Sequence, residues 1–308
     1  YPDAAIQGIR DLLKLKKADD IPIGNIESIK MGTTVATNAL LERKGENTLL
    51  AITSGFADIL RIGYQQRPEL FALDINLPDM LYSKVIEIEE RVDVNGKILT
   101  KLDTLKSEKL LKSAFNEGFK SIAIVLIHGY RYQDHENKLK LIAKEIGFEQ
   151  ISVSHNVSPL MKIIPRGDTT VVDAYLSPIL RRYVTQVKNA LGSDKNDSGK
   201  LKFMQSNGGL TDANYFQGKD AILSGPAGGV VGMVKTGEKV GLNKLIGFDM
   251  GGTSTDVCHY NGEYERTLET EVAGVRLRSP MMLINTWLLK TSEPAEASYL
   301  VALGVEWS

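Results

Sequence analysis

The sequence predicts an α/β protein in which helices flank mixed sheets, because two patterns follow one another along the chain. Between residues 110 and 154, apolar positions at helical spacing alternate with short apolar strands, which is typical of a parallel sheet. Between residues 245 and 268, short strands are separated by turn residues, which indicates antiparallel hairpins. The 308 residues correspond to about two domains and can bury a core without disulfides or structural metals.

Composition narrows the classes of function. Lys and Arg total 37, Asp and Glu total 38, and the net charge of -1 argues against a general nucleic-acid or anionic-lipid binder. No stretch approaches the ~20 apolar residues of a membrane helix. The single cysteine, Cys258, excludes an internal disulfide framework and indicates a reducing compartment. No signal-peptide pattern is visible. The chain opens on Tyr1, without an initiator methionine, and passes directly into a helical pattern, so we expect its true start to lie upstream.

The N-terminal half alternates between helical and strand patterns. We expect helices over about 2–13, 34–45, 110–118 and 139–147, and strands over 48–53, 121–127 and 151–154. Asn95-Gly96 predicts a hairpin over residues 84–100, because both residues tolerate positive φ. A long helix is predicted over about 169–191, with Pro178 expected to kink or divide it. The polar, turn-rich residues 193–200 form the best linker candidate, and a second unit starts at Leu201.

The sharpest local signal lies between an apolar strand ending at Asp249 and a second strand over 257–260. Between them, glycines and hydroxyl residues form a turn whose backbone N–H groups can bind a phosphate. Asp249 and Asp256 flank this turn and suit a magnesium ion, directly or through water. Asn261-Gly262 then predicts a second hairpin with a third strand over 263–268. The alternative is a structural hairpin whose glycines only satisfy turn geometry.

The motif D-x-G-G-T-S-T-D over residues 249–256 resembles the phosphate loop of the actin, Hsp70 and sugar-kinase superfamily. Within it, the chain resembles the hydantoinase A and 5-oxoprolinase family from near residue 1 to about Thr286. The matching stretches are residues 32–45, 53–58, 62–68, 135–136, 165–167, 173–176, 205–209 and 224–230. Pro165-Arg166-Gly167 followed by Asp173-Ala174-Tyr175-Leu176 resembles the oxoprolinase branch more than the hydantoin branch.

The resemblance implies an actin/Hsp70/ribonuclease H-like ATPase architecture that uses ATP and Mg2+. It implies ATP-dependent hydrolysis of 5-oxo-L-proline to L-glutamate, as in the glutathione (γ-glutamyl) cycle, by a cytosolic enzyme that forms a homodimer when complete. Asp249 and Asp256 take the catalytic and metal-binding positions. The expected nucleotide contacts are Gly251, Gly252, Thr253, Ser254, Thr255, Gly225, Gly228 and Gly229. An ATP-dependent hydantoinase, a related carboxylase subunit and a non-catalytic truncated product remain alternatives.

The chain departs from the family pattern at both ends. The family's first glycine-threonine phosphate hairpin is absent, and after Thr286 the sequence Trp287-Leu288-Leu289-Lys290 replaces an expected glycine-rich run. We therefore expect a fragment whose architecture is incomplete and whose isolated activity is low. The expected division is an N-terminal domain over 1–192, a linker over 193–200, the start of a hydantoinase A domain over 201–286, and an atypical tail over 287–308.

Several further residues have both a functional and a structural interpretation. Arg67 and Arg166 lie near prolines, and either could bind the substrate carboxylate or remain a solvated or ion-paired surface residue. The stretch 224–230 predicts a helix start that approaches the nucleotide or only packs closely, and 205–209 is a ligand-facing loop or an ordinary turn. His135-Glu136 is expected at a helix start, where it serves capping or a local network, and Cys258 is expected in the core.

Overall fold

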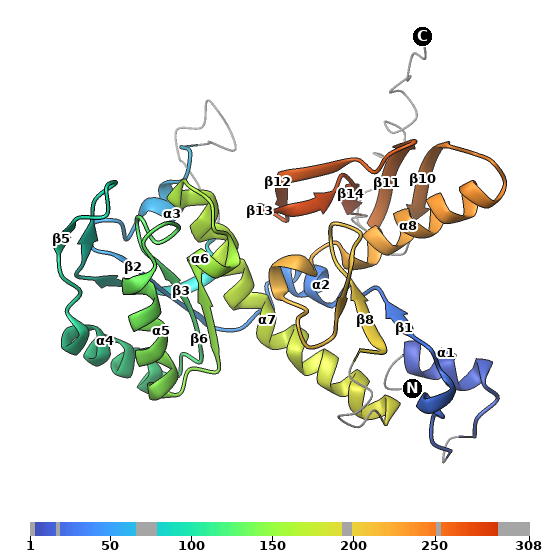
Figure 1. Ribbon diagram of the computed structural model, residues 1–308, viewed down its shortest axis with the longest axis horizontal. Coiled ribbons are helices and arrows are strands. Elements are labelled where there is room, and N and C mark those ends of the chain that lie inside the picture. Colours follow the sequence, from blue (N-terminus) through green and yellow to red (C-terminus); the bar gives the residue numbers. More distant parts are fainter. Residues whose placement is uncertain (1–3, 17–18, 66–78, 193–198, 251–253, 289–308) are drawn as a thin grey trace, which may run out of the picture. The chain divides into compact units, whose positions relative to one another are not determined.

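The computed structural model describes residues 4–16, 19–65, 79–192, 199–250 and 254–288 (Figure 1). It contains two compact units. The first is built from the chain up to Gly228 together with Arg266–Met282, and the second from Gly229–Glu265 and the chain from Leu283 onward. The units therefore do not divide at the predicted linker, of which residues 193–198 lie outside the described part of the chain. No described helix has the length and apolar character needed to cross a membrane.

A parallel sheet organises the N-terminal half of the first unit. Its strand order is β3-β2-β6-β7, formed by Tyr82–Ile88, Thr48–Thr53, Ser121–Val125 and Gln150–Val153. The two central strands are buried along their whole length, as expected where helices cover both faces. Leu49 and Ala51 belong to one core with α4 (Thr104–Asn116) and α5 (Asp134–Ile146). Leu50 and Ile52, which point to the opposite face, belong to a second core with α7 (Ile163–Leu191).

The predicted elements of this region are largely confirmed, but the expected hairpin over 84–100 is wrong in its first strand. β3 pairs in parallel with β2, because Ile86 and Ile88 face the core behind α4 and α5. Only β4 (Arg91–Val92) and β5 (Ile98–Thr100) form a hairpin, and Gly96 in its turn has φ +87. α5 ends at Gly147 in the left-handed conformation, as predicted.

α7 runs unbroken over 29 residues, so Pro178 does not divide it, and the predicted alternative of a kink at Pro178 stays a prediction. Proline has no N–H, so the Ala174 carbonyl four residues earlier loses its helical donor. Ser121 Oγ donates to that carbonyl at 2.7 Å, and Glu46 N donates to the neighbouring Tyr175 carbonyl at 2.9 Å. These tertiary bonds satisfy the acceptors beside the proline, so the helix continues at low cost.

The remainder of the first unit consists of short helices and strands, several of which contribute residues to the larger core around α7. It comprises α1 (Ala4–Leu12), the 3-10 turn η1 (Ile23–Asn25), β1 (Ile29–Met31), α2 (Val35–Leu41), α3 (Ile59–Ile62), α6 (Ser154–Val157), β8 (Leu201–Met204), β9 (Leu210–Asp212), η3 (Gly218–Asp220), β12 (Arg266–Val272) and β13 (Val275–Met282). β1 pairs in parallel with β8, which pairs antiparallel with β9. β12 and β13 form a separate two-stranded sheet.

The second unit contains an antiparallel sheet in the order β10-β11-β14, formed by Lys244–Met250, Ser254–Asn261 and Asn285–Leu288. The helix α8 (Ser224–Lys239) enters this unit at Gly229. The first predicted hairpin, β10–β11, is confirmed. The second is wrong, because beyond Asn261-Gly262 only Tyr260 and Tyr264 form a bridge, and the following strand pairs with β13.

Candidate phosphate-binding site

The β10–β11 hairpin brings the two predicted carboxylates together. Asp249 and Asp256 are register partners in this antiparallel pair. Directly opposite residues have Cβ atoms about 4.5–5.5 Å apart and project from the same face of the sheet. Both aspartates therefore stand at the end of the hairpin that carries the turn. The turn residues Gly251, Gly252 and Thr253 lie outside the described residues.

The third strand of the sheet holds one of these carboxylates. Thr286 on β14 is the register partner of Asp256, and its Oγ1 donates to Asp256 Oδ1 at 2.6 Å. Asp256 is half-buried, whereas Asp249 is exposed. Sequence reasoning missed Thr286 as a site residue, because nothing local in the sequence says which strand pairs beside β11. Of the predicted hydroxyl residues, Ser254 begins β11 and the Thr255 side chain is buried.

The pair of carboxylates fits one kind of metal site. Mg2+ is usually bound through one or two carboxylates, several waters and substrate phosphates, and seldom by a complete protein cage. Among the described residues, no group of three or more His, Cys, Asp or Glu side chains could hold a metal. Asp249 and the second oxygen of Asp256 match the open arrangement, in which the nucleotide completes the coordination.

In the second unit, the helix α8 packs against the face of the β10–β11 hairpin that carries Gly247 and Asp249 (Figure 1). A Cβ atom on Gly247 would lie 2.7 Å from Met233 Sδ and 2.5 Å from Cys258 Sγ, and one on Gly237 would lie 2.6 Å from Leu245 Cδ1. These contacts show that α8 and β10 run antiparallel. The Gly229 end of α8 therefore points toward the Asp249 end of β10. A Cβ atom on Gly229 would meet nothing within 4 Å, which leaves its backbone open to approach.

The first residues of α8 belong to the first unit and serve packing there. Thr33 N donates to Ser224 Oγ at 3.1 Å, and Gly225 N donates to the Thr33 carbonyl at 3.1 Å. A Cβ atom on Gly225 would lie 2.9 Å from Thr34 Cγ2, so this glycine permits a close approach between two backbones. Gly228 makes only an ordinary contact, 3.9 Å from Met204 Cγ. The packing interpretation thus accounts for Gly225, while Gly228 and Gly229 stay candidates for nucleotide contact.

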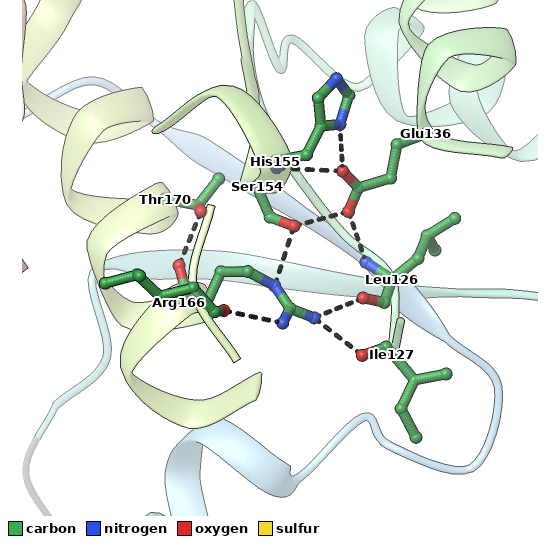
Figure 2. A network of polar contacts seen from close by, with 8 residues as sticks. Leu126, Ile127, Glu136, Ser154, His155, Arg166 and Thr170 are labelled. Atoms are coloured by element: carbon green, nitrogen blue, oxygen red, sulfur yellow. Dashed lines mark hydrogen bonds and ion pairs between the residues drawn. The ribbon is translucent and has the colours of Figure 1, made fainter. Parts of the chain in front are cut away.

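Arg166 lies in the first turns of α7 and not in a loop as predicted (Figure 2). Its side chain is fully buried, with Nη2 donating to the carbonyls of Leu126 and Ile127 at 2.6 and 2.9 Å. Nε donates to Ser154 Oγ at 3.1 Å, and Nη1 donates to the Leu160 carbonyl at 3.3 Å. The guanidinium is thus engaged by protein acceptors, which replaces the predicted role of substrate ligand with a structural one. Arg67 lies outside the described residues.

Glu136 completes this buried network (Figure 2). Its Oε1 accepts from Leu126 N at 2.9 Å and from Ser154 Oγ at 2.6 Å. Its Oε2 accepts from His155 N and Nδ1 at 3.1 and 2.6 Å. The predicted position of His135-Glu136 in a local network at the start of α5 is confirmed, since His135 Nδ1 also lies 2.8 Å from Glu90 Oε2. Burial lowers the pKa of the Arg166 guanidinium, and Glu136 opposes that change.

Two other predicted candidates have structural roles. Residues 205–209 form the turn between β8 and β9, where Gly208 has φ +84 and Asn207 Oδ1 accepts from Gly209 N at 2.7 Å. Cys258 is half-buried opposite Gly247 in the β10–β11 pair, rather than deep in the core. Burial raises the pKa of its thiol, and a thiol with a raised pKa is a poor nucleophile.

The fold defines a mixed α/β protein with parallel and antiparallel sheets flanked by helices. Residues 1–147 match the hydantoinase/oxoprolinase N-terminal region, and residues 166–287 match hydantoinase/oxoprolinase itself. The chain belongs to the hydantoinase/oxoprolinase family. The two matched regions meet between residues 147 and 166, inside the first compact unit and upstream of the predicted linker.

Curated relatives and solved structures agree with this assignment. The chain is 43% identical to 5-oxoprolinase 1 of Arabidopsis thaliana and 40% identical to 5-oxoprolinase of Saccharomyces cerevisiae, each over 93% of its length. It spans about a quarter of these relatives, 25% in both cases. The ATP-dependent caprolactamase from Pseudomonas jessenii matches with a TM-score of 0.74 and 26% identity, over 92% of this chain and 42% of that one. Nucleotide-free acetone carboxylase, at 23% identity, TM-score 0.74 and coverage of 85% and 39%, shows the fold alone.

Proposed function

We propose that this chain forms part of an ATP-dependent 5-oxoprolinase, which hydrolyses 5-oxo-L-proline to L-glutamate. The observation that carries the proposal is the register pairing of Asp249 with Asp256 beside a glycine-rich turn. The names of the relatives, which are 40–43% identical, support the substrate. A cytosolic location, a homodimer and a place in the glutathione (γ-glutamyl) cycle belong to the same proposal.

ATP, when bound with Mg2+, supplies the phosphoryl group that converts the unreactive lactam oxygen into a leaving group. Asp249 and Asp256 would hold the magnesium ion, and Thr286 orients the Asp256 carboxylate through its 2.6 Å hydrogen bond. The backbone N–H groups of residues 251–255 would bind the phosphates, and the backbone at Gly228 and Gly229 would approach the nucleotide. Preorganised donors of this kind stabilise charge that develops during the reaction.

The proposal is tested with a chimera, in which residues 1–286 replace the matching region of the Saccharomyces cerevisiae 5-oxoprolinase. We expect 5-oxoproline to stimulate phosphate release, with glutamate formed in equal amount. Asp256→Asn should lower kcat by roughly a hundredfold, which is about 3 kcal/mol. Glu263→Gln is the matched control, because Glu263 is an exposed carboxylate in the same unit.

Two results would count against the proposal. Turnover of hydantoin without turnover of 5-oxoproline would replace the substrate with that of the hydantoinase branch. Normal turnover by Asp256→Asn would remove the metal-binding role of the hairpin. Thermal unfolding of the chimera with and without Mg-ATP separates both results from a failure to fold, since a ligand of the folded state raises Tm.

A further inference from the structure

A cavity lies entirely within the first unit, whereas the β10–β11 hairpin belongs to the second unit. It measures about 500 Å³, which is within the range of small-molecule sites. One wall is a stripe of α7, another is β7, and a third is the segment 213–217 before η3. Asp173, Ser177 and Arg181 stand four residues apart on α7, so they follow one another along the same face.

A buried carboxylate lies at one end of this cavity. Asp173 is only 4% exposed, and its oxygens accept from Ser152 Oγ at 2.6 Å and from Ser177 Oγ at 3.0 Å. The backbone N–H of Lys219 also donates to Asp173 Oδ1, at 3.4 Å, while the ammonium of Lys219 pairs with Asp220 at 2.9 Å. Among the described residues, no cationic side chain forms an ion pair with Asp173. Burial raises the pKa of the Asp173 carboxyl, which reflects the cost of holding a negative charge there. A cationic ligand group would offset that cost.

The other end of the cavity is positively charged. Arg181 and Lys188 lie further along α7 than Asp173, and Lys140 of α5 also lines the cavity. A chain of hydrogen bonds connects this end to the carboxylate: Arg181 Nη2 donates to Gln150 Oε1, Gln150 Nε2 donates to Ser152 Oγ at 2.9 Å, and Ser152 Oγ donates to Asp173. The polar wall is therefore ordered from a cationic end to an anionic end. An extended zwitterion along this wall would place its ammonium group at the anionic end and its carboxylate at the cationic end.

The distance between the two charged ends and the apolar part of the lining restrict the class of ligand further. Asp173 and Arg181 are eight helical residues apart, about 12 Å along the axis, and helical side chains lean toward the N-terminus, which brings the guanidinium closer to Asp173. A peptide of two or three residues spans about 7–10 Å between its termini, whereas a single amino acid is much shorter. Val153, Val157, Val184 and Phe216 add apolar surface to the lining of the cavity.

We propose that this cavity binds a short peptide of two or three residues, with its ammonium group at Asp173 and its carboxylate at Arg181. The small apolar surface in between favours small side chains on the peptide. The site is independent of the proposed phosphate-binding hairpin, since none of its residues lies in the second unit. Its occupation would be a property of the chain whether or not the lactam substrate is assigned correctly.

The experiment uses trialanine as the probe and isothermal titration calorimetry of the full chain as the measurement. We expect trialanine to bind, and both N-acetyl-trialanine and trialanine amide to bind at least about tenfold more weakly, because each lacks one terminal charge. Free alanine should bind more weakly still. These comparisons need no mutation, so they do not depend on whether a variant folds.

Variants then assign the two ends. Arg181→Gln should abolish the difference between trialanine and trialanine amide, and Asp173→Asn should abolish the difference between trialanine and its N-acetyl form. Arg182→Gln is the matched control, because Arg182 is an exposed neighbour that pairs with Glu46 at 3.0 Å outside the cavity lining. The proposal is overturned if trialanine does not bind, if the capped peptides bind equally well, or if Arg181→Gln and Arg182→Gln behave alike.

Discussion

Two polar clusters of this protein use charge in opposite ways. Around Arg166, every charged group lies within the fold and is bonded to protein atoms: the guanidinium to carbonyls and a serine, and Glu136 to backbone and side-chain donors (Figure 2). At the β10–β11 hairpin, Asp249 and Asp256 face each other, and the described part of the chain supplies one side-chain donor to the pair, from Thr286. We call the first cluster closed, because protein atoms bond all its charges, and such a cluster contributes to stability. We call the pair Asp249 and Asp256 open, because its carboxylates are available to a ligand. The predictions below test this contrast.

The largest effect is expected on removing the cation of the closed cluster. Arg166→Met should lower the free energy of unfolding by about 3–5 kcal/mol, because it leaves Glu136 buried without its cation and the Leu126 and Ile127 carbonyls without donors. Urea unfolding monitored by circular dichroism measures the loss. Arg182→Met on the exposed face of the same helix is the control, and should change stability by less than about 0.5 kcal/mol. Similar losses for the two variants would contradict the closed-cluster interpretation.

Asp168 and Arg276 form an intermediate case, a partly buried ion pair between α7 and β13 with Nε and Oδ2 2.8 Å apart. Burial raises the pKa of Asp168 from 3.8 to about 6, despite the hydrogen bond from Arg276. The folded state therefore holds this proton more tightly than the unfolded chain does. The stabilisation that comes from this bound proton is fully present below about pH 4 and is lost as the pH rises to about 6.

The difference in unfolding free energy between wild type and Asp168→Asn should therefore fall as pH rises from about 4 to about 6, by up to about 3 kcal/mol. Denaturant unfolding at a series of pH values measures it, and the other titrating groups cancel in the comparison. A difference that grows with pH would show that attraction to Arg276 outweighs burial.

At the open pair, substitutions should change binding and leave stability alone. Asp249→Asn and Asp256→Asn should each weaken magnesium-dependent nucleotide binding by roughly tenfold, about 1.4 kcal/mol, because each removes one charge beside the metal. Fluorescence titration with a labelled ATP analogue, with and without Mg2+, measures the change. Urea midpoints should stay within error of wild type. A large loss of stability would place these carboxylates in a structural role.

The smallest expected effect concerns Thr286, whose hydroxyl donates to Asp256 at the open pair. Thr286→Val removes the hydroxyl that bonds Asp256 but keeps the shape of the side chain. We expect a loss of binding of a few-fold, about 1 kcal/mol or less, because an exposed hydrogen bond contributes little. The same titration measures it, and Thr267→Val on β12 serves as a control. An effect as large as that of Asp256→Asn would make Thr286 a ligand in its own right.

Local patterns predicted most of the elements, but not their partners. β2, β6, α5 and its stop at Gly147 follow from residues within each segment. The position of β3 does not, because alternation identifies a strand without saying whether it turns back or crosses to a parallel neighbour. The continuity of α7 through Pro178 depends on Ser121 and Glu46, which are distant in sequence. Such tertiary donors cannot be read from the helix itself.

The same limit governs the candidate site. The sequence predicted that Asp249 and Asp256 flank one short turn, whereas their pairing as register partners comes from the structure, in which β11 begins at Ser254. Arg166 was misjudged because a nearby proline suggested a loop, while in the structure Pro165 occupies the first turn of α7, where its missing N–H costs nothing. Thr286 required knowledge of β14, which pairs from outside the hairpin.

After the β10–β11 hairpin of the second unit, the chain re-enters the first unit through β12 and β13, and this order affects how the protein folds during synthesis. Val275, Leu277 and Met281 on β13 are buried in the same core as the residues of α7, although roughly a hundred residues separate them in the chain. A ribosome releases the polypeptide in order, at about 5–20 residues per second. For several seconds after α7 has emerged, the nascent chain exposes the apolar surface that β13 later covers. During that interval, holdase chaperones and aggregation compete with completion of the unit.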